Sequence, residues 1–313
     1  MPVVDLQLQS GDPLWEDRLA GTKSNGRSFS ALLMALVPLT VVGVLVFWWL
    51  GTLPDHADPE VGREIFGNIP APIVALFYVT VAVFLGLTVY LFALRARNWE
   101  RGAAESRTRL VKQRINRLRE GLSMKTLLRE PAAGIPHAAL YYGFLVLFLG
   151  TVTVELDHLL PNNLKFLEGG FYQGFSFVLD VFALVYLIGL AWLGVRRYGI
   201  KPWRLRSKTK PEDAWILLTL AAIGITGIAV EAARIADLGR PAFEQWSFVG
   251  YASSYLVWGA AAGTHQVLWA AHVVSFLAFL VVLPNTKLRH MVTSPANMYL
   301  SPRQRSVGAM REM

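Results

Sequence analysis

The stretch GIPHAALYYGFLVLFLGTVTVELDHLL, residues 134–160, is an apolar run about as long as a bilayer is thick. It carries His137 at its head and His158 at its foot, and the only charged residues between them are Glu155 and Asp157. A membrane-spanning helix needs roughly 20 mostly apolar residues. The stretch is therefore predicted to cross a membrane with a titratable, metal-ligating side chain at each end.

The rest of the chain has the same character. Of its 313 residues, 54% are hydrophobic and only 17% are charged, whereas a soluble domain carries about a quarter charged residues. Further long apolar runs lie at residues 31–54, 69–94, 169–195, 214–230 and 257–286. Together with the first stretch they predict an all-α protein, a polytopic membrane helix bundle with six transmembrane helices.

The basic residues predict how this bundle is oriented. The N-terminus holds three Lys and Arg, the loop 95–130 eleven, the loop 196–210 seven and the C-terminal tail five, which leaves four of the 30 for the opposite side. The positive-inside rule therefore places both termini and the two basic loops in the cytoplasm. We predict a cytoplasmic N-terminal segment at 1–30, a membrane domain at 31–292 and a cytoplasmic basic tail at 293–313. The net charge of +8 then reflects topology and anionic membrane lipid, and not nucleic acid.

The chain contains no cysteine. This excludes disulfides, iron–sulfur clusters held by thiolates of this chain, and covalently attached c-type haem. Any redox centre in this chain must therefore be ligated by histidine, and any iron–sulfur cluster must belong to another polypeptide.

Two connections have structure of their own. In the first basic loop, Val111, Ile115, Leu118 and Leu122 recur at helical spacing among basic residues, which predicts an amphipathic helix. Such a helix lies on the inner leaflet or forms a docking surface for a cytoplasmic partner. On the outer side, the mixed aromatic segment 238–256 is predicted to form an interfacial helix or a lid over the helix ends.

Five of the six histidines lie on two predicted helices, His137 and His158 on the third and His265, His272 and His290 on the sixth. At a rise of 1.5 Å per residue, His137 and His158 are roughly 30 Å apart and His272 and His290 about 27 Å. Because the two helices are antiparallel, His137 is opposite His290 at the inner level and His158 is opposite His272 at the outer level. Haem b iron takes one axial nitrogen from each side, so the pattern predicts two haems b, one at each level.

Two alternatives stay open for these histidines. His265 lies seven residues before His272 and would replace it as the outer ligand if the sixth helix starts earlier; otherwise it lies at the outer mouth, where it would serve quinone chemistry. A histidine near the end of a membrane helix also serves as an interfacial residue that bonds to lipid headgroups, which requires no haem.

Four segments carry a resemblance to a known family. They are GIPHAALYYGF, ELDH, GITGIAVEAARI and WAAHVVSFLAFLVVLPNTKLRHMVTSPANMYL. Across roughly residues 70–300 the chain resembles the membrane domain of the nitrate reductase gamma-subunit superfamily. It looks most like the branch attached to iron–sulfur proteins of the heterodisulfide-reductase type, which includes electron-transfer-flavoprotein:menaquinone oxidoreductases.

The resemblance implies two b-type haems and electron exchange between a membrane quinone and cytoplasmic iron–sulfur clusters. His272 and His290 match the paired ligands on the family's last helix. His137 and His158 match the earlier ligand helix, with a wider spacing than in the nitrate reductase branch. Six membrane helices are predicted, whereas the nitrate reductase branch has five. This difference also favours the branch attached to iron–sulfur proteins.

Several charged residues near the outer end remain to be placed. Glu231, His265 and Asp157 are predicted to form a proton relay for the quinone, which gains two protons with two electrons. Alternatively, Glu231 forms an ion pair with Arg234, one turn away. Asp180 lies within the fourth helix, where an unpaired carboxylate is costly. It would pair with Arg234, hydrogen-bond a ligand histidine or conduct protons.

The sequence thus predicts a quinone-linked oxidoreductase subunit, a di-haem cytochrome b integral to the bacterial cytoplasmic membrane. It would pass electrons between the menaquinone pool and a cytoplasmic iron–sulfur partner, with electron-transfer flavoprotein upstream. Two other classes stay open: a proton-relay transporter and a haem-free membrane anchor of a cytoplasmic enzyme.

Overall fold

The computed structural model describes residues 29–53, 60–63, 65–98, 111–257 and 261–300, so the predicted N-terminal segment up to 28 and the tail beyond 300 lie outside the described residues. Six helices in the described part are long and apolar enough to cross a membrane. They are α2 (Phe29–Gly51), α3 (Ala71–Ala96), α5 (Pro131–His158), α6 (Gly169–Gly194), α8 (Pro211–Asp237) and α10 (Ala261–Asn285). The prediction of an all-α bundle with six membrane helices is confirmed.

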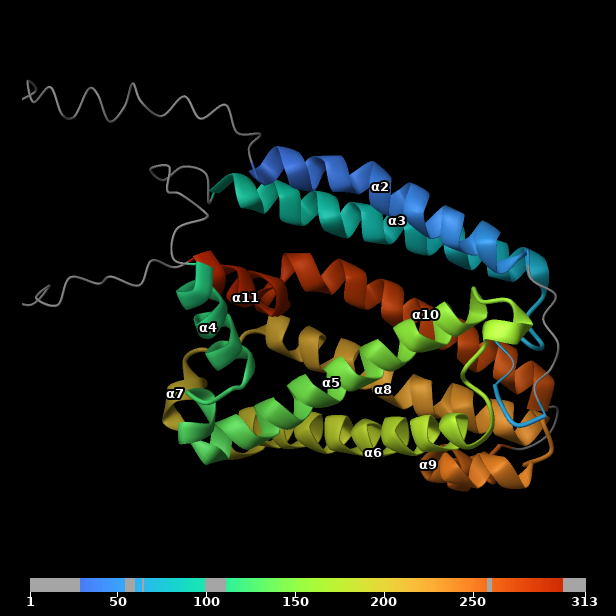
Figure 1. Cartoon of the computed structure of the whole chain (residues 1–313). Helices are drawn as coiled ribbons and strands as arrows, with labels where there is room; N and C mark the ends of the chain where they lie inside the picture. The colour runs from blue at the N-terminus through green and yellow to red at the C-terminus, as the bar shows by residue number, and fades with distance from the viewer. Residues whose placement is uncertain (1–28, 54–59, 64, 99–110, 258–260, 301–313) are drawn as a thin grey trace, which may run out of the picture.

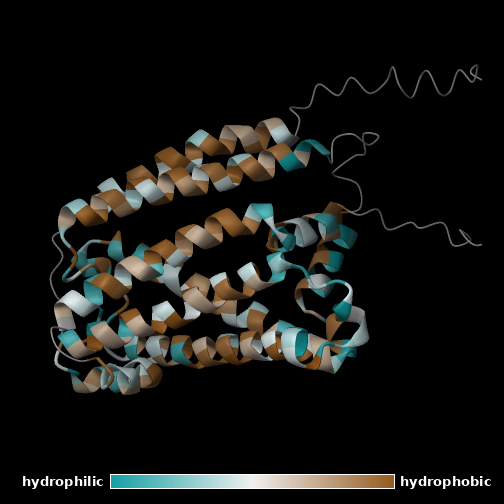
Figure 2. Cartoon of the chain, turned by 180° about the vertical axis from the view of Figure 1, so that it is seen from behind, coloured by the Kyte–Doolittle hydropathy of each residue, from teal (hydrophilic) through white to brown (hydrophobic). Residues whose placement is uncertain are grey.

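The short helices lie at the two ends of the bundle (Figure 1). One end carries α4 (Val111–Leu122), α7 (Trp203–Arg206) and α11 (His290–Leu300) together with the start of α2, and the opposite end carries α9 (Phe248–Ser254). The two predicted basic loops therefore meet at one end. Hydrophobic residues cover the long spans and hydrophilic ones gather toward the ends (Figure 2).

Helices α5 and α6 approach each other through glycines. A Cβ atom added at Gly143 of α5 would lie 2.7 Å from Cβ of Tyr186 on α6, and one added at Gly150 would lie 2.5 Å from Leu179. The buried Tyr186 also donates its hydroxyl to the Leu220 carbonyl of α8 over 2.7 Å. Small residues that let helix backbones approach are typical of membrane bundles. Gly143 and Gly150 therefore serve the contact between α5 and α6.

Replacing Gly143 with leucine is expected to separate α5 from α6 and to destabilise the bundle by about 1–3 kcal/mol or more, because the backbone of Tyr186 cannot yield. Gly174→Leu is the matched control, since a Cβ at Gly174 on α6 meets nothing within 4 Å. Thermal unfolding in detergent, followed by tryptophan fluorescence, measures both variants. Equal unfolding temperatures for the two would contradict the role of Gly143.

The sixth membrane helix ends earlier than predicted. Helix α10 stops at Asn285, one residue past Pro284, and a short 3₁₀ helix (Lys287–Arg289) leads into α11, which starts at His290. Proline cannot donate to the carbonyl four residues before it, here that of Leu280, which instead accepts the Thr88 hydroxyl of α3 over 3.0 Å. The expectation that His272 and His290 share one helix is therefore corrected.

The predicted amphipathic helix is confirmed as α4. Its buried residue is Arg114, which donates to the carbonyls of Tyr299 and Leu300 at the end of α11 over 3.2 Å each. This satisfies carbonyls that a helix C-terminus leaves without partners. Val111 and Ile115 stay exposed, so the apolar side of α4 is open to lipid or to a partner.

Candidate functional site

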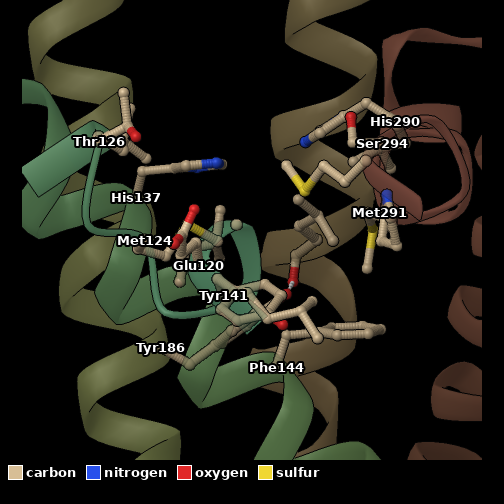
Figure 3. A pocket seen from close by; sticks show the side chains of 18 residues that line it. Glu120, Met124, Thr126, His137, Tyr141, Phe144, Tyr186, His290, Met291 and Ser294 are labelled. Carbon is tan, nitrogen blue, oxygen red and sulfur yellow. Dashed lines mark hydrogen bonds between the residues drawn. The ribbon is translucent and has the colours of Figure 1, made fainter. Parts of the chain in front are cut away.

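The structure brings together the two histidines of the predicted inner level. His137 lies in the second turn of α5 and His290 begins α11. Their ring centroids are 6.1 Å apart and the ring planes differ by 29°. Figure 3 shows the two imidazoles pointing toward each other from opposite walls of a pocket. Their role as ligands stays a prediction that this geometry supports.

The spacing of this pair fits two ligands of one haem iron. A metal–imidazole bond is about 2 Å long and the ring centre lies about 1 Å further back, so opposite imidazoles on one iron have ring centres about 6 Å apart. The Nδ1 of His290 hydrogen-bonds the Lys287 carbonyl over 2.7 Å. That bond fixes the tautomer and leaves Nε2 with its lone pair free for a metal.

The pocket between the two rings has a volume of about 300 Å³. Its walls come from α5 and from α11, and the segment after α4 closes it (Figure 3). They are mostly apolar and include Leu140, Phe144 and Met291. Such walls keep water away from a redox centre. The closing segment around Met124 was not anticipated from the sequence, and neither was the contribution of Met298 from α11, because these methionines follow no recognisable spacing.

Two acidic residues at the start of α8 hold the segment that positions His290. Glu212 accepts the Lys287 backbone N–H over 2.6 Å, and Asp213 accepts the Lys287 ammonium over 2.7 Å. Asp213 is buried and also pairs with Arg197 over 2.9 Å. The carbonyl that orients His290 is therefore fixed from a different membrane helix. Glu212 and Asp213 could not be identified from the sequence, because nothing in it places them next to Lys287.

The outer level is arranged differently. His158 packs edge-on against Phe66, with ring centroids 5.6 Å apart, and the Phe66 ring also contacts Trp269, one turn before His272. The Nδ1 of His272 lies 2.9 Å from the Thr226 hydroxyl of α8. The Phe66 ring thus lies between the foot of α5 and α10. The predicted outer pair, His158 and His272, stays a prediction.

His265 lies two turns before His272 at the start of α10. It is buried, and its Nδ1 is hydrogen-bonded to the Asn68 side chain in the connection between α2 and α3. Gln266 donates to the Asn68 carbonyl over 2.7 Å. His265 is therefore held at the outer mouth, where the sequence analysis expected it to serve a quinone.

Asp157, one member of the predicted relay, has a structural partner. It is buried, and its Oδ1 accepts the backbone N–H groups of Phe166 and Leu167 over 2.8 and 3.0 Å. It therefore folds the loop after α5 back onto the helix. Glu155, which the sequence analysis did not select, accepts the Tyr78 hydroxyl over 2.7 Å and lies one turn before His158.

The alternative ion pair between Glu231 and Arg234 is not formed. Arg234 pairs instead with Glu244, with contacts of 2.6 and 3.1 Å, and the Tyr172 hydroxyl also bonds to Glu244. Glu244 belongs to the connection between α8 and α9 and is fully buried. The segment 238–256, predicted as a lid over the helix ends, therefore places the Glu244 carboxylate inside the bundle.

Asp180 makes neither of the first two contacts expected for it. Its Oδ2 accepts the N–H groups of Val249 and Gly250 at the start of α9 over 2.6 and 3.3 Å, and the Glu231 carboxyl lies next to its side chain. The third expectation, that Asp180 handles protons, stays a prediction.

The outer level also contains an orphaned donor. The Nε of Arg63 is buried and has no hydrogen-bond partner. A group with an acidic edge fits beside it. No set of three or more His, Asp and Glu among the described residues is placed to hold a metal ion, but a haem iron needs only two imidazoles. The residues present therefore fit haem at the inner level, and the unpaired Arg63 Nε at the outer level would be satisfied by an acidic group.

Residues 127–308, more than half of the chain, match the model of the nitrate reductase gamma subunit family. The chain belongs to this family. The matched range contains all the histidines discussed above, from His137 to His290. No solved structure matches the chain.

Two relatives define the branch of the nitrate reductase gamma subunit family. The chain is 33% identical to the EtfAB:quinone oxidoreductase of Syntrophomonas wolfei over 250 residues, which are 75% of this chain and 34% of that protein. It is 25% identical to the probable iron-sulfur-binding oxidoreductase FadF of Bacillus subtilis over 245 residues, 76% of this chain and 34% of that protein. The chain thus spans about a third of the length of these relatives.

These matches confirm the resemblance to the branch attached to iron–sulfur proteins. Together with the six apolar spans, they make the chain an integral membrane subunit of a redox family.

Proposed function

We propose that the chain is a di-haem cytochrome b subunit that passes electrons between a cytoplasmic iron–sulfur partner and the menaquinone pool of a bacterial cytoplasmic membrane. The observation that carries the proposal is the pair His137 and His290, whose rings face each other across a largely apolar pocket with centroids 6.1 Å apart. Two imidazoles at this spacing suit one six-coordinate iron.

Each part of the chain has a role in this proposal. His137 and His290 would hold the inner haem b, and His158 and His272 the outer one, with His265 as the alternative outer ligand. Haem b, when bound, supplies one-electron redox chemistry. The Lys287 carbonyl and the Thr226 hydroxyl orient the imidazoles of the last two helices.

A quinone that gains two electrons also gains two protons, and the outer end holds groups suited to move them. In the proposed relay, the His265 side chain is hydrogen-bonded to that of Asn68, and the Glu231 carboxyl lies next to that of Asp180. Asp157 would contribute through its free oxygen, since its Oδ1 holds backbone N–H groups.

The partner is proposed from the relatives and from the absence of cysteine. The relatives are about three times as long as the matched part, and their names state an iron–sulfur protein and an electron-transfer-flavoprotein:quinone oxidoreductase. We therefore propose an iron–sulfur partner of the heterodisulfide-reductase type, with electron-transfer flavoprotein upstream. It would dock at the end that carries α4 and α11, next to the inner pocket.

The decisive experiment is a dithionite-reduced minus oxidised visible spectrum of the purified protein, with a pyridine haemochrome count per chain. We expect a b-type spectrum and two haems per chain. A colourless protein from haem-replete cells would refute the proposal and would favour the proton-relay transporter or the haem-free anchor.

The contact between Asp213 and Lys287 leads to a prediction for the inner site. Asp213→Asn is expected to release haem from that site about tenfold faster, since outer-shell changes weaken metal binding about 10–100-fold. Transfer of haem to excess apomyoglobin measures the rate. Asp237→Asn, at the opposite end of the same helix, is the control and should leave the inner rate unchanged. Equal rates for both variants would show that Asp213 does not position His290.

A further inference from the structure

Arg63 has an unusual place at the outer end of the bundle. It lies in the connection between α2 and α3, which is fixed to the start of α6. The Gly169 N–H donates to the Val61 carbonyl over 2.8 Å, and Gly62 forms an isolated β-bridge with Glu168. Arg63 is partly buried and its Nε is fully enclosed. The backbone on the N-terminal side of Arg63 is therefore fixed to the start of α6, and the Arg63 side chain is directed into the protein.

Among the described residues, the guanidinium of Arg63 has no direct anionic partner. No hydrogen bond or ion pair joins it to any residue in the described ranges, and the two nearby carboxylates are engaged elsewhere. Glu244 binds Arg234, and Glu231 lies next to Asp180. A buried charge without a partner is costly, and such charges in membrane proteins are functional. Burial, and then the charge of Arg234, lowers the pKa of Arg63, as expected where the positive charge is not compensated.

The surroundings of Arg63 place it at the outer level. It interacts electrostatically with His272, the proposed outer ligand, and with His265. Arg234 lies in the same cluster, but its guanidinium is occupied by Glu244 and Tyr172. Arg63 is therefore the guanidinium of this cluster that is free to bind an anion next to His272.

We propose that Arg63 binds a carboxylate of the prosthetic group at the outer level, a propionate of haem b. This inference rests on the proposed function. A guanidinium binds a carboxylate through two parallel hydrogen bonds and keeps its charge in an apolar site. Haem b carries its two carboxylates on one edge, and that edge would face the outer end of the bundle, where Arg63 enters. A lipid phosphate has similar chemistry, so the experiment must separate the two.

The first test is Arg63→Gln, with the midpoint potentials of both haems measured by spectroelectrochemical titration. A positive charge next to a haem favours its reduced state, so its loss should make the outer potential more negative and leave the inner one unchanged. Arg63→Lys, which keeps the charge, should restore most of the shift. Arg240→Gln is the control: Arg240 is another outer arginine, but it binds Ser254. Unchanged potentials in Arg63→Gln would overturn the inference.

The second test needs no variant, so a folding defect cannot obscure it. Wild-type protein from haem-deficient cells is loaded with haem b or with its dimethyl ester, whose carboxylates are blocked. We expect the ester to occupy the outer site less and the inner site equally well. Equal occupancy of the outer site by both would overturn the inference and would favour a lipid phosphate as the partner of Arg63. Failure of the wild type to bind any haem would instead overturn the proposed function itself, and this inference with it.

Discussion

Replacing His290 with alanine is expected to reduce the haem content from two per chain to one. The inner pocket offers two imidazoles 6.1 Å apart, and the remaining walls are mostly apolar. Without His290, the iron would keep only the nitrogen of His137. A pyridine haemochrome count measures the loss, and redox titration should show a single remaining transition.

The pairing itself is tested by a double substitution. If His137 and His290 hold the same haem, then each single variant and the double variant should all retain one haem, because residues that act as one unit have non-additive effects. If they belong to different sites, the double variant loses both. Asn285→Ala is the control, because Asn285 lies close to His290 in sequence and only bonds the Val281 carbonyl of its own helix.

The helices could be predicted from the sequence because each is set by its own composition. An apolar run of bilayer length has few alternatives to a spanning helix, so α5 and α3 were evident without any knowledge of their neighbours. The inner histidine pair followed from the same reasoning, since opposite directions bring His137 and His290 to one level.

What could not be predicted depends on contacts between distant segments. The break after Pro284 could not be foreseen, because a proline in a membrane helix does not reveal whether the chain continues straight. The pairing of Arg234 with Glu244 rather than Glu231 depends on how the connection before α9 folds back into the bundle. Local spacing favoured the residue one turn away.

The two ends of the bundle differ in a way that suits the proposed function. The inner pocket is lined mostly by apolar and aromatic side chains, which suits electron transfer alone. The outer end gathers buried charges and carboxyl pairs around Asp180 and Arg234. Proton-coupled quinone chemistry requires such groups, which supports placing the quinone near the outer level.

Replacing Glu244 with alanine is expected to give the largest loss of stability. The carboxylate is fully buried, the Arg234 guanidinium almost so, and they are 2.6 Å apart. Removal of one partner of a buried pair leaves an uncompensated charge, which costs about 3–5 kcal/mol. The cost is higher here because the positive charge of Arg63 lies close enough to repel the charge that Arg234 would then carry unpaired. The variant should unfold at a clearly lower temperature in detergent.

Two further variants separate the charge from the side-chain volume. Glu244→Gln keeps the shape and an acceptor for Tyr172 but removes the negative charge, so it should lie close to Glu244→Ala if the charge dominates. Glu168→Ala removes an exposed carboxylate from the same end of the bundle and should have little effect. If Glu244→Ala unfolds at the same temperature as Glu168→Ala, then the pair with Arg234 does not stabilise the outer end, and another anion must compensate Arg234.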